Sequence, residues 1–156
     1  MAYHLRAVLA ETKRLEAMAK AAPGVRVVEL TKELALIPLT EAAEAKVPGP
    51  EGVPPFPGLR VGSRLAAWAA SGSQGGMVAY IEADYGAGKD FQAAVVWEDG
   101  GVSSGPWKDA TAWDPREDAR ERPVNAALHL LGVRQGDFND EWDAVALARH
   151  TETEAW

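Results

Sequence analysis

The residues of this chain best suited to acid–base chemistry are its histidines, of which there are three. Asn125 and His129 are four positions apart, so they share one side of a helix if this segment is helical. Asp137 and Glu141 follow closely enough to approach them in three dimensions, and a carboxylate beside an imidazole can transfer protons. Asn125, His129 and His150 are therefore the candidate catalytic residues, against the more common alternative that a lone histidine is structural.

A glycine-rich turn ending in lysine lies within the stretch YIEADYGAGKDFQAAVVW, from Tyr80 to Trp97. A phosphate-binding loop would need glycine at Ala83, a hydroxyl at Asp90 and a helix after the lysine. The chain has alanine and aspartate at these two positions. Apolar and polar residues alternate on both sides of GAGKD, which indicates a strand and not a helix after the lysine. The pattern predicts a β-hairpin instead, and we expect no bound nucleotide or other cofactor.

Acidic residues recur at short spacing in DFNDEWDAVALA, from 137 to 148, as they do in calcium-binding loops. An EF-hand needs glycine and glutamate where this chain has Trp142 and Ala148. The acids Asp140, Glu141 and Asp143 instead suit the first turn of a helix, where the helix dipole favours negative charge. Cysteine is absent and the histidines are not at a zinc-binding spacing, so no metal site is expected.

The charge of the chain is concentrated in its second part. The formal net charge is −7, while residues 1–58 hold seven basic and seven acidic residues and are neutral. Nucleic acid and anionic membrane surfaces should repel such a molecule, whereas a basic protein partner is favoured. The first 20 residues lack the apolar run of a signal peptide or membrane span, so we expect a cytoplasmic protein.

Five of the six tryptophans divide into two groups. Trp68, Trp97 and Trp142 fall on the apolar side of expected helices or strands, where packing in the core explains them. Trp107 and Trp113 fall in a stretch with little periodicity. Large aromatics in a loop either fix the loop to the core or contact a partner, and the sequence leaves both possibilities open.

The elements that must position these residues belong to one domain, since 156 residues suit a single core. The first part predicts a strand at 3–10, a helix at 12–22, and a hairpin of Val25–Leu30 with Leu34–Leu39, whose Pro38 favours a position near a sheet edge. The Pro- and Gly-rich segment 47–58 predicts a strap over the core, anchored by Phe56, with a docking motif for a partner as the alternative.

The second part predicts a helix at 59–71, the hairpin already described and a short strand around Val102. Asp114 is expected to cap a short helix, and Pro123 to begin another that Gly132 ends. A final helix is expected from about Asn139, with Trp142, Val145 and Ala146 facing inward. The sum is an α+β domain with a mixed or mainly antiparallel sheet of five to six strands.

Three stretches, YIEADYGAGKDFQAAVVW, PVNAALHLLGV and DEWDAVALARHTETEAW, resemble a group of small bacterial proteins of uncharacterised function, of an actinobacterial kind. The resemblance covers about the second half of the chain, and it implies no activity or cofactor. It implies that the following residues belong to one surface: Tyr80, Glu82, Asp84, Tyr85, Gln92, Asn125, Asp140, Glu141, Asp143 and His150.

These observations favour a non-enzymatic interaction protein, such as an inhibitor, immunity-type or accessory protein, that binds a basic protein through an acidic surface in its second half. The expected binding residues are Tyr80, Glu82, Asp84, Tyr85, Gln92, Trp107, Trp113, Asp140, Glu141 and Asp143. The alternatives are a small hydrolase-like enzyme that uses a histidine and a carboxylate, and a structural subunit of a larger particle.

Overall fold

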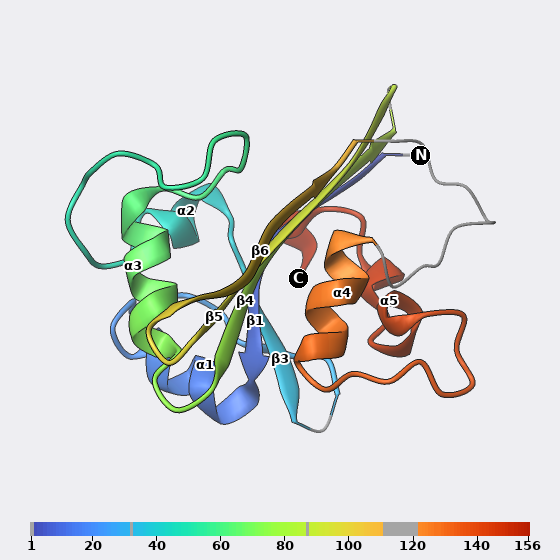
Figure 1. The fold of residues 1–156 in the computed structure, drawn as a ribbon, viewed down its shortest axis with the longest axis horizontal. Helices are drawn as coiled ribbons and strands as arrows, with labels where there is room; N and C mark the ends of the chain where they lie inside the picture. The colour runs from blue at the N-terminus through green and yellow to red at the C-terminus, as the bar shows by residue number, and fades with distance from the viewer. Residues whose placement is uncertain (1, 32, 87, 111–121) are drawn as a thin grey trace.

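The centre of the molecule is an antiparallel sheet (Figure 1). The computed structural model describes residues 2–31, 33–86, 88–110 and 122–156. Within these residues, six strands form the sheet in the order β2-β3-β1-β4-β5-β6. Their bounds are β1 Tyr3–Glu11, β2 Val28–Glu29, β3 Leu34–Pro38, β4 Met77–Gly86, β5 Lys89–Glu98 and β6 Gly101–Asp109. The expected α+β class is confirmed.

The central strands are buried on both faces because helices cover both. In β1, Leu5 and Leu9 point to one face of the sheet, and Val8 points to the other. The same alternation divides β4, where Tyr80 faces one core and Ile81 the other. All five of these side chains are fully buried, so the molecule has three layers: helices, sheet, helices.

The first face of the sheet is covered by the helices that precede β4. These are α1 Thr12–Ala19, α2 Glu41–Glu44 and α3 Ser63–Gly72. Leu15, Leu65 and Trp68 come from these helices and pack against the sheet. The segment 47–58 has no regular secondary structure, and its Phe56 packs edge-on against Trp97, with the ring centroids 6.0 Å apart.

The second face is covered by the last part of the chain. It carries α4 Pro123–Leu130, α5 Glu141–Ala144 and the 3₁₀ turns η2 Leu147–Arg149 and η3 Thr153–Ala155. Leu128, Leu147 and the C-terminal Trp156 are buried there. Figure 1 shows α4 and α5 on one side of the sheet and α2 and α3 on the other.

The hairpin predicted around GAGKD is confirmed, since Gly86 of β4 pairs with Lys89 of β5. A strand, not a helix, therefore follows the lysine. Pro123 begins α4 at its first position, as predicted.

Three predicted elements have other lengths in the structure. The short strand expected around Val102 is the nine-residue β6, because pairing with β5 outweighs the weak local pattern. The predicted strand Val25–Leu30 is reduced to the two residues of β2. The final helix ends after four residues, because Ala146 adopts a left-handed conformation with φ of 54° and its side chain is exposed. The helix expected at Asp114 lies outside the described residues.

A polar network fixes α2 and the irregular segment before α3 to the sheet. Arg6 of β1 is 5% exposed, and its guanidinium donates two hydrogen bonds to Glu44, of 2.8 and 2.9 Å. Its Nε also donates to the Tyr80 hydroxyl at 3.1 Å. Glu82 completes the network by accepting from the backbone N–H of Arg60 at 2.9 Å.

The network holds Arg6 and Tyr80 in fixed protonation states. Burial lowers the pKa of Arg6, but the hydrogen-bonded Glu44 carboxylate and the neighbouring Tyr80 outweigh burial and raise it above its usual value. Burial raises the pKa of Tyr80, and the negative charge of Glu82 raises it further. Arg6 therefore stays charged and Tyr80 stays a neutral hydrogen-bond donor.

We predict that Glu44→Ala destabilises the protein strongly, because it leaves the buried Arg6 charge without its partner. The free energy of unfolding should fall by about 3 kcal/mol, at the lower end for buried pairs, since the Glu44 side chain is 33% exposed. The control is Glu51→Ala, because the Glu51 side chain pairs with Arg64 but is 84% exposed, and this change should cost less than about 1 kcal/mol. Urea unfolding of both variants measures the difference, and equal losses would contradict the role of the network.

Candidate functional site

Several residues predicted to be functional gather between the sheet and α4. Gln92 points to the second face of the sheet, where its Oε1 accepts from the backbone N–H of Val124 at 3.0 Å. The bond satisfies one of the free N–H groups at the start of α4. Its Nε2 donates to the Tyr85 hydroxyl. Gln92 is 4% exposed, so it positions α4 and does not itself contact a partner.

Asn125 connects α4 to α5. Its Nδ2 donates to Asp140 at 3.2 Å, and its Oδ1 accepts from the backbone N–H of Trp142 at 2.9 Å. Asp140 in turn caps α5 by accepting from the N–H of Asp143 at 2.8 Å. The acids at this position therefore begin a helix, as the sequence indicated, and Asn125 is structural in its contacts.

A histidine–carboxylate pair lies one helical turn further along α4. His129 Nδ1 is 3.4 Å from Glu141 Oε1, so Glu141 is the one of the two acids considered, Asp137 and Glu141, that lies beside it. The Glu141 side chain is 3% exposed while that of His129 is 42% exposed, so a buried carboxylate lies beside a ring that is partly at the surface. Such a pair can accept or donate a proton. His150, by contrast, packs edge-on against Trp156 at 4.9 Å.

Aromatic rings pack beside this cluster. Tyr3, Tyr85 and Trp142 form a group with centroid distances of 5.2 to 6.3 Å. Trp107 is half-buried and packs against the same core from β6, which favours the fixing role over partner contact. Trp113 lies outside the described residues.

The structure does not bring the remaining predicted residues to this place. Tyr80, Glu82 and Asp84 point to the opposite face of the sheet, because they alternate with Ala83 and Tyr85 along β4. Tyr80 is fully buried and Glu82 is 6% exposed. Neither can present its side chain to a partner, so the residues singled out do not form one surface.

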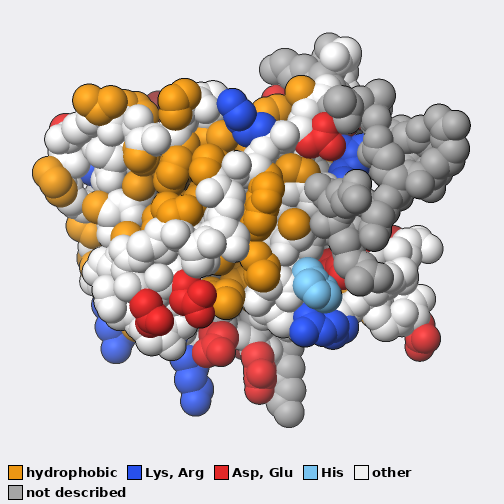
Figure 2. Space-filling model, in the orientation of Figure 1, with side chains coloured by type: hydrophobic (Ala, Val, Ile, Leu, Met, Phe, Trp, Pro, Cys, Tyr) orange, Lys and Arg blue, Asp and Glu red, His pale blue; other side chains and the backbone are white. Residues whose placement is uncertain are grey.

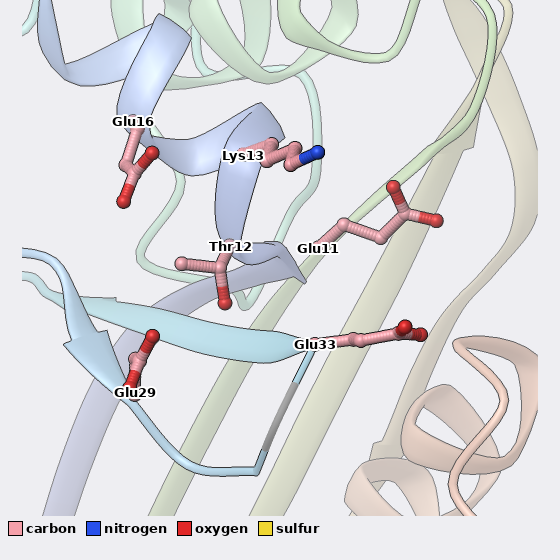
Figure 3. Close-up of a pocket in the computed structure, with 6 residues that line it drawn as sticks. All are labelled: Glu11, Thr12, Lys13, Glu16, Glu29 and Glu33. Atoms are coloured by element: carbon pink, nitrogen blue, oxygen red, sulfur yellow. The ribbon is translucent and has the colours of Figure 1, made fainter.

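A different group of acids lines a hollow of about 450 Å³ at the end of the sheet where β1 stops and β3 starts. We call it the glutamate hollow after the four glutamates in its lining, Glu11, Glu16, Glu29 and Glu33. Figure 3 shows Glu11 and Glu33 extending in the same direction, with Glu16 and Glu29 on the other side of Thr12. Backbone pairing brings Glu11 and Glu33 together, because Glu11 lies opposite Leu34 and the N–H of Thr12 donates to the Glu33 carbonyl.

The glutamate hollow carries charge that the fold itself does not neutralise. All four glutamates are exposed, and none is in an ion pair within the described part of the chain. Lys13 is the positive side chain among the residues that line it. The hydroxyl oxygen of Thr12, also in the lining, is buried and has no hydrogen-bond partner. Sequence reasoning missed this site, although Glu11 and Glu33 flank strands predicted to begin and end there.

A second hollow, of about 340 Å³, adjoins the first and shares Glu11 and Glu33 with it. Five apolar side chains contribute to its mixed lining, beside Glu11, Thr31, Glu33 and Arg134, and it is here called the apolar groove: Leu34, Leu131, Val133, Phe138 and Val145. Phe138 is the most exposed of these five, at 56%.

No three acids or histidines of the described residues gather closely enough to hold a metal ion. Within the same residues, no helix has both the length and the apolar character needed to cross a membrane.

We predict that all three tyrosines ionise late in the folded protein. Burial raises the pKa of Tyr3, Tyr80 and Tyr85 above the ordinary value of about 10. A pKa that is higher in the folded than in the unfolded state stabilises the fold below pH 10, and this contribution is lost as the pH rises further. Tyrosinate absorbance of native and urea-unfolded protein should therefore separate, with the native curve at higher pH. Coincident curves would contradict the burial of these hydroxyls.

We also predict that Asn125→Ala loosens α5. The change removes the acceptor for the Trp142 N–H and should lower the free energy of unfolding by about 1–3 kcal/mol. Asn139→Ala is the control, because its bond to Asp143 is exposed and its loss should matter by less than about 0.5 kcal/mol. Amide exchange at Trp142 measures the local effect, and unchanged exchange in Asn125→Ala would refute it.

Comparison with protein-family models, curated proteins and solved structures gave no match for this chain.

Proposed function

We propose that the chain is a non-enzymatic interaction protein, of the inhibitor, immunity or accessory kind, that binds a basic protein through the glutamate hollow. The observation that carries the proposal is the set of four exposed glutamates around one opening, none of which forms an ion pair with another described residue. Figure 2 shows acidic side chains along the lower edge of the molecule, with basic side chains beside them, at the end where α1 lies in Figure 1.

The electrostatics of the hollow favour a cationic side chain. A lysine or arginine that enters it would gain carboxylate partners that form no ion pair within the described structure. The net charge of −7 extends the attraction beyond contact distance and speeds the encounter with a basic partner.

The proposal keeps the expected class of partner but changes the surface. Among the acids of the second half, Asp140 caps α5, and Glu82 and Glu141 are buried. Their charges are bound within the fold. The four glutamates of the glutamate hollow are exposed and line one opening, so we take them as the better candidates for contact.

A small enzyme is the second candidate, and the His129–Glu141 pair is the observation that favours it. A carboxylate-held imidazole with an exposed edge is a common general base in hydrolases. No hollow described above includes His129 among its lining residues, so a substrate site beside the imidazole lacks support.

We predict that Glu29→Lys with Glu33→Lys abolishes capture of a basic partner from a lysate of the native host. The control reverses the same number of charges at the other end of the sheet, with Glu152→Lys and Glu154→Lys, both exposed. The wild type and the control should retain the partner at low salt. With the purified partner, the hollow variant should associate at least about tenfold more slowly, with a smaller change in dissociation.

Loss of the partner with the control pair alone would place binding in the C-terminal acids and overturn the proposed site. Capture of no basic protein by any form would overturn the proposed class. In that case a panel of ester and amide substrates, tested on wild type and His129→Gln, decides whether the enzyme candidate replaces it.

A further inference from the structure

The glutamate hollow and the apolar groove form one continuous surface. Both are lined by Glu11 and Glu33, at the ends of β1 and β3. Glu33 is followed directly by Leu34, whose backbone lies opposite Glu11 in the sheet. Acidic side chains therefore stand at the margin of an apolar floor, and a ligand that fills one hollow reaches the other.

The apolar groove is built by elements that meet only in the folded chain. Leu34 comes from β3, Leu131 and Val133 follow α4, and Val145 follows α5. Leu34 and Val145 are almost completely buried and form the floor. Phe138, more than half exposed, stands in the loop between α4 and α5 and offers an uncovered ring to an apolar side chain.

The charges around the groove are asymmetric. Glu11 and Glu33 lie on the side shared with the glutamate hollow, where Glu16 and Glu29 continue the negative charge. Arg134 lines the groove but not the glutamate hollow, and no ion pair involves it within the described residues. Its guanidinium is bound instead to backbone carbonyls, of His129 and Val133. A second cation of a ligand is therefore disfavoured at the Arg134 side.

We propose that this surface binds a protein segment in which a large apolar side chain enters the groove beside Phe138 and a neighbouring lysine or arginine lies between Glu11 and Glu33. The inference rests on the proposed function and adds the chemistry of the partner segment. Because the acids adjoin the floor directly, the cation stands one or two positions from the apolar residue, given about 3.3 Å per residue in an extended segment. Glu11 and Glu33 favour a basic residue in the partner segment by charge complementarity, and the exposed ring of Phe138 favours a large apolar residue beside it.

A random heptapeptide library displayed on phage tests the inference without knowledge of the natural partner. The enriched peptides should pair a large apolar residue with lysine or arginine within about two positions, and disfavour basic residues on the other side of the apolar residue. Fluorescence anisotropy of one labelled peptide then measures binding. Replacing either its apolar residue by serine or its cation by glutamine should weaken binding about tenfold or more.

Protein variants assign the two contacts separately. In Phe138→Ser, the affinity should no longer depend on the apolar residue of the peptide but should still depend on its cation. In Glu11→Gln with Glu33→Gln, the affinity should no longer depend on the cation but should still depend on the apolar residue. Each protein change should therefore be non-additive with the matching peptide change and additive with the other. Glu152→Gln with Glu154→Gln is the control and should bind as the wild type does.

Enriched peptides without a basic residue, no enrichment, or binding that is insensitive to Glu11, Glu33 and Phe138 would overturn the inference. These failures differ from failure of the proposed function. If the lysate partner depends on Glu29 and Glu33 but no peptide depends on Phe138, the acidic surface stands and the paired apolar contact is wrong. If peptides behave as described while no charge-dependent partner is captured, the peptide-binding surface stands and the proposed function is wrong.

Discussion

The constraint on which the rest of the structure depends is that the sheet is covered on both faces. Side chains in the middle of the central strands are then buried, so each must be apolar or have a hydrogen-bond partner. Arg6 is the exception in β1, and it is accommodated because Glu44 and Tyr80 bind its guanidinium. That network fixes the segment before α3 over one face. Exposed glutamates lie at one end of the sheet, where they line the glutamate hollow.

Local pattern predicted the elements whose own sequence determines them. Alternation along β4 and β5 gave the hairpin and assigned neighbouring residues to opposite faces, and Pro123 marked the start of α4. It did not predict which face is covered, so Tyr80 and Glu82 were expected at the surface although α3 and the preceding segment bury them. The length of β6 depends on pairing with β5, and the end of α5 on the left-handed Ala146, neither of which a periodicity reveals.

The candidate site shows a similar division. The sequence left either Asp137 or Glu141 as the carboxylate that could approach His129, and in the structure Glu141, the first residue of α5, lies 3.4 Å from its Nδ1. The glutamate hollow was missed because charge was counted along the chain, and residues 1–58 are neutral in that count. In the fold, Arg6 is buried against Glu44 while Glu11 and Glu33 are exposed at one end of the sheet. The net charge of a sequence segment thus differs from the net charge of a surface, because strand pairing decides which charged residues lie together.

The central claim is that a basic partner binds at the end of the sheet formed by the last residue of β1 and the first residues of β3. Backbone amide chemical shifts of the labelled protein, recorded during titration with the captured partner, test it most directly. The account predicts that the shifts changing most belong to Glu11, Thr12, Glu33 and Phe138, with His129 and Trp156 unaffected. Changes centred on His129 and Glu141, with the glutamate hollow silent, would contradict it.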